Sequence, residues 1–248
     1  MNVNNTIIFS TAIVIAVGIA CITFLNRYPS IEKGYVEVKG MGQTNFESNL
    51  IVWEGTFKVE YKNLRDAYIN LTNHRKIVES FLISNDLKDD EIVFGPVSTD
   101  EIFENIYSQK GDLVGEKFKT YKLSQKVMIE SKDVAKIEKV SRLVTDVLNN
   151  GVQFYSKSPR YYYTDLSDLK LDLISKATED ARLRAENIVL KSGASLDKLV
   201  KADMGILQIV GQNSDENFSW GGSFNTSSKK KTASITIKLR YTVNNKTK

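Results

Sequence analysis

Residues 176–193 read KATEDARLRAENIVLKSG, and this stretch does most to decide the fold. Alanines recur at four-residue steps, and larger apolar residues continue a similar spacing on both sides. The spacing is close to the period of an α-helix, so residues 165–192 are predicted to form one long helix with a single apolar stripe. The predicted stripe comprises Leu166, Leu169, Leu173, Ala177, Ala181, Ala185 and Ile188. Because its middle is built of alanine, we expect a neighbouring backbone to approach it closely.

Charged residues surround this stripe in two groups. Glu179, Arg182 and Glu186 lie opposite the stripe, at spacings of three and four residues that favour ion pairs on a solvated helix face. Asp180 and Arg184 flank the stripe instead, one helical turn apart. The second pair has three interpretations: a structural ion pair, a contact at an interface, or part of a ligand site.

The rest of the globular chain alternates between strand and helix patterns. Period-two alternation predicts strands, and apolar residues every three or four positions predict helices. Strand patterns cover about residues 35–42, 50–61, 91–108, 116–129, 152–163, 199–212 and 233–243, and helix patterns cover residues 64–82, 134–148 and 165–192. The resulting order, β-β-α-β-β-α-β-α-β-β, predicts an α+β fold with helices packed on mainly antiparallel sheets. We expect one two-lobed domain over residues 35–245.

The N-terminal region is apolar. Residues 7–25, from Ile7 to Leu25, carry no charge, and as a helix they would match the thickness of one bilayer core. The basic n-region and cleavage site of a secretory signal peptide are missing, so an uncleaved transmembrane signal-anchor is favoured over a cleaved, periplasmic form. Residues 1–6 would then be a short tail and residues 26–34 a linker.

The amino-acid composition excludes most of the common types of catalytic site. The chain has a single cysteine, Cys21, and a single histidine, His74. Zinc sites, Cys/His pairs and Ser/His/Asp triads need several such residues or a poised base. His74 falls on the apolar stripe of helix 64–82 or its rim, so a packed, hydrogen-bonded imidazole is expected. We predict no catalytic, cofactor-binding or metal-ligating residue, and no cofactor.

Polar segments also predict structure more than chemistry. The acidic residues 89–91 are expected to be solvated and to begin the next element. Residues 213–231 are expected to form a mobile loop. The overlapping stretch GGSFNTSSKKKT, residues 221–232, lacks the Gly-Lys-Ser/Thr ending of a phosphate-binding loop. A net charge of +4 with both signs interspersed gives no basic patch, so no nucleic-acid partner is expected.

Several of these elements together resemble the SIMPL domain family. The resemblance rests on the opening strand Val38-Lys39-Gly40-Met41-Gly42, the strand ending Val59-Glu60-Tyr61, the alanine helix ending at Gly193, and the strand from Ile235 to Tyr241. It covers about residues 35–243. The resemblance implies an extracytoplasmic bacterial protein that self-associates, with family links to envelope or oxidative stress and no established catalytic activity. It also implies that the large domain lies outside the bacterial inner membrane.

Three hypotheses for function follow. The first is a non-enzymatic, membrane-anchored envelope scaffold that forms a homo-oligomer. The second is a periplasmic ligand-binding or hydrolytic module using Asp180, Arg184 and the tyrosines of residues 161–163. The third is an adaptor that binds another envelope protein.

Overall fold

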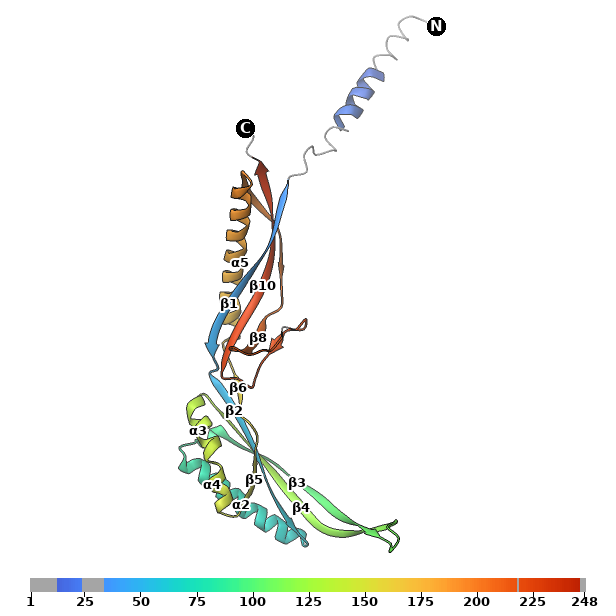
Figure 1. Cartoon of the computed structure of the whole chain (residues 1–248), viewed down its shortest axis with the longest axis vertical. Helices are drawn as coiled ribbons and strands as arrows, with labels where there is room; N and C mark the ends of the chain where they lie inside the picture. The colour runs from blue at the N-terminus through green and yellow to red at the C-terminus, as the bar shows by residue number, and fades with distance from the viewer. Residues whose placement is uncertain (1–12, 24–33, 218, 246–248) are drawn as a thin grey trace, which may run out of the picture. The chain divides into compact units, whose positions relative to one another are not determined.

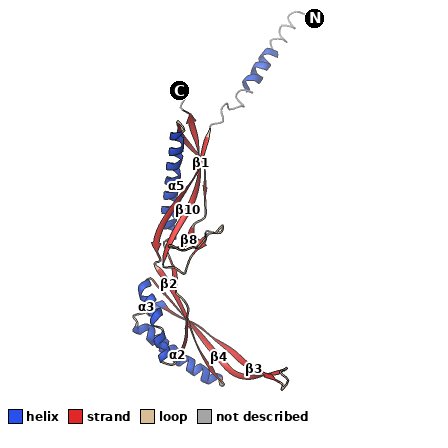
Figure 2. Ribbon diagram, viewed as in Figure 1, coloured by secondary structure: helices blue, strands red, loops and turns tan. Residues whose placement is uncertain are grey.

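The computed structural model describes residues 13–23, 34–217 and 219–245. These divide into two compact units: one takes its members from residues 1–40, 179–203 and 237–248, and the other from residues 41–178 and 204–236. Figure 1 labels most of the elements, and Figure 2 distinguishes helices from strands. The boundary between the units crosses four elements, which are β1 (Tyr35–Glu47), α5 (Leu166–Lys191), β7 (Ala194–Met204) and β10 (Lys230–Asn245).

One five-stranded sheet lies wholly in the second unit and has the order β3-β4-β2-β5, with β6 pairing β2. Its strands are β2 (Leu50–Tyr61), β3 (Ile92–Tyr107), β4 (Leu113–Ser131), β5 (Gln153–Ser156) and β6 (Arg160–Tyr162). β2 and β4 are antiparallel, with a register that runs from Ile51 opposite Ser131 to Tyr61 opposite Tyr121. β3 and β4 form the predicted hairpin, which turns at Gly111 with a φ of 86°.

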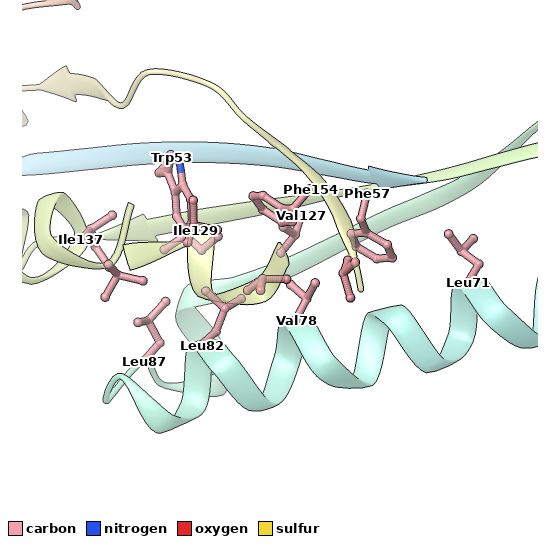
Figure 3. Packing of buried hydrophobic residues seen from close by; sticks show 14 of the residues in the cluster. Trp53, Phe57, Leu71, Val78, Leu82, Leu87, Val127, Ile129, Ile137 and Phe154 are labelled. Atoms are coloured by element: carbon pink, nitrogen blue, oxygen red, sulfur yellow. The ribbon is translucent and has the colours of Figure 1, made fainter. Parts of the chain in front are cut away.

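Helix α2 (Leu64–Ser84) packs on this sheet (Figure 3). It begins where Asn63 Oδ1 accepts hydrogen bonds from the first-turn amides of Arg65 and Asp66, at 2.8 and 3.3 Å. Alternate residues of β2 point into the core, where Trp53 and Phe57 are completely buried. The predictions of a half-buried strand at 50–61 and an amphipathic helix after it are confirmed.

Two predicted elements of this unit are each divided in the structure. The helix expected over 134–148 is α3 (Val134–Leu143) followed by α4 (Thr145–Asn149), because the adjacent β-branched residues Val144 and Thr145 are weak helix formers. The strand expected over 152–163 is β5 and then β6. Pro159 lies between them and has no amide to donate to a strand ladder.

The short helical turn η1 (Asp89–Glu91) corrects another expectation. Glu91 is not solvated: its side chain is 16% exposed and lies 3.2 Å from Lys136 Nζ. Its carboxylate also accepts hydrogen bonds from the Lys88 amide, at 3.0 Å, and from the Ser131 hydroxyl. Glu91 therefore ties the start of β3 to the end of β4.

The other five-stranded sheet has the order β1-β10-β8-β9, with β7 pairing β10. The strand expected over 199–212 is instead β7 and then β8 (Gln208–Gly211). The strand is interrupted at Gly205. A Cβ added to this glycine would lie 2.9 Å from the carbonyl oxygen of Thr236. β9 (Ser223–Phe224) lies within the segment expected to be a loop and runs parallel to β8.

The long helix is confirmed as α5, and its stripe is nearly as predicted. Leu169, Leu173 and the three alanines are buried. Ile188, however, is 53% exposed, and Val189 is buried in its place, because the stripe continues in steps of four residues. The expected close approach is present within the second unit: a Cβ on Gly42 of β1 would lie 2.1 Å from the carbonyl oxygen of Leu173.

The predicted membrane anchor lies only partly within the described residues. Residues 13–23 are helical, and Ile13, Val14 and Val17 are each more than half exposed. Residues 7–12 and 24–25 fall outside the described part of the chain. Within the described part, no helix has both the length and the apolar character needed to span a membrane.

Candidate functional site

The charged pair beside the alanine stripe is an ion pair on the surface of α5. Arg184 Nε donates to Asp180 Oδ2 at 2.9 Å, and the two side chains are 60% and 33% exposed. On the opposite face, Arg182 pairs with Glu179 and Glu186, as the spacing predicts. An exposed pair within one helix stabilises that helix only weakly, so nothing here marks Asp180 and Arg184 as a reactive centre.

The tyrosines of residues 161–163 belong to the second unit, whereas Asp180 and Arg184 belong to the first. The Tyr161 hydroxyl donates to Glu138 Oε1 at 2.9 Å, and burial together with this bond raises the pKa of Tyr161 to about 12. The ring of Tyr163 packs on Phe46 with a centroid separation of 4.8 Å. These two tyrosines serve packing and hydrogen bonding within their unit, as expected for a half-buried strand.

Lys231 is the most unusual cation of the described structure, because its side chain is only 1% exposed. Its Nζ donates to the carbonyl oxygen of Tyr161 at 2.8 Å and to that of Asn225. The Asn225 amide in turn donates to Glu216, which also accepts from the Gly211 amide at 2.9 Å. These bonds close the segment between β8 and β10 onto β6.

Burial lowers the pKa of Lys231 to about 8. Lys231 belongs to the segment expected to form a mobile loop, and that expectation is wrong for this residue, which lies in β10 and is buried. The sequence does contain a pattern that indicates this burial. Lys231 lies two and four residues before the inward-facing Ala233 and Ile235, and alternate residues of a strand share a face. Because its ammonium is enclosed by carbonyl groups, its role is to hold the segment in place.

The β3–β4 hairpin extends past the rest of its sheet (Figure 1). The pairing of β2 with β4 ends at Tyr121, so residues 102–120 form a ribbon of only two strands, here called the arm. Phe103 and Phe118 face each other across the ribbon, with ring centroids 6.0 Å apart. Ile106 lies an odd number of residues from Phe103 and therefore points to the other face.

The arm exposes apolar side chains without a core of its own. Thr120, at its base, is its one buried residue. Its large exposed apolar residues, with exposed fractions, are Phe103 (49%), Ile106 (43%), Tyr107 (59%), Leu113 (58%), Val114 (62%) and Phe118 (36%). β3 is also the terminal strand of its sheet, so the backbone groups along its outer edge have no strand partner among the described residues.

A polar depression of about 310 Å³ lies at the opposite edge of the same sheet. It is lined by Lys58, Val59, Glu60, Tyr61, His74, Gly151 and Gln153. His74 is half-buried, and its Nδ1 is buried without a hydrogen-bond partner among the described residues. The expectation of a hydrogen-bonded histidine is therefore wrong for this nitrogen. Burial lowers the pKa of His74.

The order of elements and the alanine helix of this chain resemble those of the SIMPL family. A model of the SIMPL proteins, described as a protein of unknown function (DUF541), matches residues 36–244. The chain belongs to the SIMPL family. No curated protein matches this SIMPL chain. In the described residues, no three His, Cys, Asp or Glu side chains lie together in a way that could hold a metal ion. The arm and the polar depression are the two surfaces of this SIMPL protein from which a function can be argued.

Proposed function

We propose that this SIMPL protein is a non-catalytic scaffold of the bacterial cell envelope, built from copies of the chain that associate through the arm. The observation that carries the proposal is the exposure of the arm on both of its faces. An isolated two-stranded ribbon is at best marginally stable in water, and it gains stability when a third strand or a packed face covers it. A partner is therefore the expected environment of residues 102–120.

The charge of the arm favours a second copy as this partner. The arm contains three acidic residues, Glu104, Asp112 and Glu116, and three lysines, Lys110, Lys117 and Lys119. Two copies of a ribbon with no net charge do not repel each other. Pairing of the outer edges of two β3 strands would satisfy free backbone groups on both copies and extend the sheet across a twofold axis.

Sedimentation velocity of the full chain in a mild detergent tests this proposal. We expect the wild-type chain to sediment as an oligomer at micromolar concentration. A double variant, Phe103→Thr with Val114→Thr, retains residues that favour strands but removes apolar area from the arm, so we expect it to sediment as a monomer.

The matched control removes exposed apolar area elsewhere. Leu171 and Leu190 on α5 are 66% and 65% exposed, so Leu171→Gln with Leu190→Gln should leave the oligomer intact. A monomeric wild-type chain, or equal dissociation of both double variants, would rule out assembly through the arm.

We further propose that residues 7–25 tether the scaffold to the inner membrane, with the SIMPL domain on the periplasmic side. Support comes from the uncharged stretch of nineteen residues and from the exposed apolar side chains of residues 13–23. The chain should remain in the membrane pellet after alkaline carbonate extraction and keep its N-terminal residues. Release into the supernatant with the mass of a shortened chain would show a cleaved periplasmic form instead.

A further inference from the structure

The polar depression in the second unit forms where the edge of β2 is left open. β5 pairs with β2 only as far as Gln153 opposite Lys58, whereas β4 pairs with β2 as far as Tyr61. Residues 59–61 of β2 are therefore paired on one side only. Their free edge lies in the wall of the depression, together with side chains from both faces of the strand.

His74 of α2 contributes a hydrogen-bond donor to this depression. Its Nδ1 is buried and has no partner among the described residues, and its side chain is one of those that line the depression, so we infer that the ring edge with Nε2 faces the depression. A buried amide-type N–H without an acceptor is less well tolerated than a buried lone pair without a donor. The favoured form is thus the neutral imidazole with its proton on Nε2.

The remaining polar groups determine which ligand chemistry fits. Lys58 and Glu60 are both lining residues and bring charges of opposite sign to the depression, although the Lys58 ammonium also lies 4.8 Å from the centroid of the Tyr155 ring; Gln153 adds an amide that both donates and accepts. A carboxylate ligand would be repelled by Glu60, and an ammonium ligand by Lys58. A neutral hydroxyl group can donate a hydrogen bond to Glu60 and accept one from Lys58. A ligand with several hydroxyl groups can therefore form hydrogen bonds with Lys58, Glu60 and Gln153 together.

We propose that this depression binds one residue of a saccharide. Tyr61 is 40% exposed and supplies an aromatic surface for the apolar face of a sugar ring. The volume of about 310 Å³ lies at the lower end of the range of ligand pockets, which suits a single sugar ring. The site does not depend on assembly through the arm.

The test uses the full chain in a zwitterionic detergent that contains no sugar. Tri-N-acetylglucosamine and maltotriose are titrated separately, with binding followed by calorimetry and by saturation-transfer NMR. We expect saturable binding of at least one trisaccharide, with one site per chain. The difference between the two probes shows whether an acetamido group is preferred.

Two variants localise the binding. Gln153→Leu should weaken it roughly tenfold through loss of hydrogen bonds, whereas Asn73→Leu, an equal change at an exposed position of α2 outside the depression, should not. His74→Phe replaces the imidazole by another aromatic ring and removes both nitrogens, so binding should weaken while the melting temperature does not fall. Because Gln153 is exposed, its variant remains informative even if the His74 variant fails to fold.

Three outcomes would overturn the proposal. One is the absence of saturable binding of either trisaccharide at concentrations on the order of 10 mM. Another is binding that Gln153→Leu leaves unchanged. The third is displacement of the bound sugar by acetate or ethylammonium at lower concentrations than free sugar requires, because that result would indicate a site for an ion.

Discussion

The buried Lys231 makes the free energy of unfolding depend on pH. Its pKa is about 8 in the folded chain, compared with about 10.4 for a lysine in an unfolded chain. Between these values the unfolded state binds more protons than the folded state, so the free energy of unfolding rises with pH across that window. The rise attributable to Lys231 is of the order of 3 kcal/mol.

Urea denaturation at several pH values measures this effect. Lys231→Met should remove the rise between about pH 8 and 10.4, because the variant no longer has an amine to deprotonate. Lys230→Met is the matched control, since the side chain of Lys230 is 67% exposed and pairs with Glu47 at the surface. Equal pH dependence in the two variants would show that Lys231 is not the group responsible.

For single residues such as Lys231 and His74, the sequence shows the type of side chain but not which groups surround it in the fold. Continued back from Ala233, the alternation of β10 would place Lys231 inward, but its two carbonyl partners could not be foreseen: Tyr161 lies 70 residues earlier in the chain, and Asn225, six residues earlier, lies in a segment expected to be a loop. His74 was correctly assigned to an amphipathic helix. The depression that it lines depends on where β5 ends, which no local pattern predicts. Of the polar depression, only the histidine could be singled out from the sequence.

Among the elements, β1 packs closely on the backbone of α5. A Cβ on Gly42 would lie 2.1 Å from the Leu173 carbonyl oxygen and 3.0 Å from the Ala177 amide nitrogen. Both are backbone atoms that cannot swing aside, so we expect Gly42→Ala to lower the free energy of unfolding by roughly 1–3 kcal/mol.

Gly115 provides the control for this substitution. It also lies in a strand, but an added Cβ there meets no atom within 4 Å. Gly115→Ala should therefore leave stability unchanged or raise it slightly, because alanine restricts the unfolded chain. Equal urea midpoints for the two variants would contradict a close contact between β1 and α5.

Most elements could be located from periodicity, because each has one buried face. The errors occur where the apolar spacing continues but the helix or strand is interrupted, as at Val144, Pro159 and Gly205. At these positions a short interruption leaves the apolar spacing almost intact. The extent of the arm was also beyond prediction, since it depends on the length of β2, a strand forty residues earlier in sequence.

At the scale of the whole molecule, the central claim is that copies of the chain associate through residues 102–120. Family membership, which the order of elements already suggested, assigns no activity. The claim therefore depends on physical properties of the arm: free strand edges, apolar side chains on both faces and no net charge. An interface built by strand pairing would have a direct signature, because it protects backbone amides from exchange with solvent.

Hydrogen–deuterium exchange of the full chain across a dilution series is the most direct measurement. Amides of residues 102–107 in β3 should exchange slowly at concentrations where the chain is oligomeric. They should exchange rapidly once dilution yields monomers, while amides of β2 remain protected throughout. If the arm exchanges at the same rate in oligomer and monomer, or if protection appears elsewhere on assembly, the arm is not the interface.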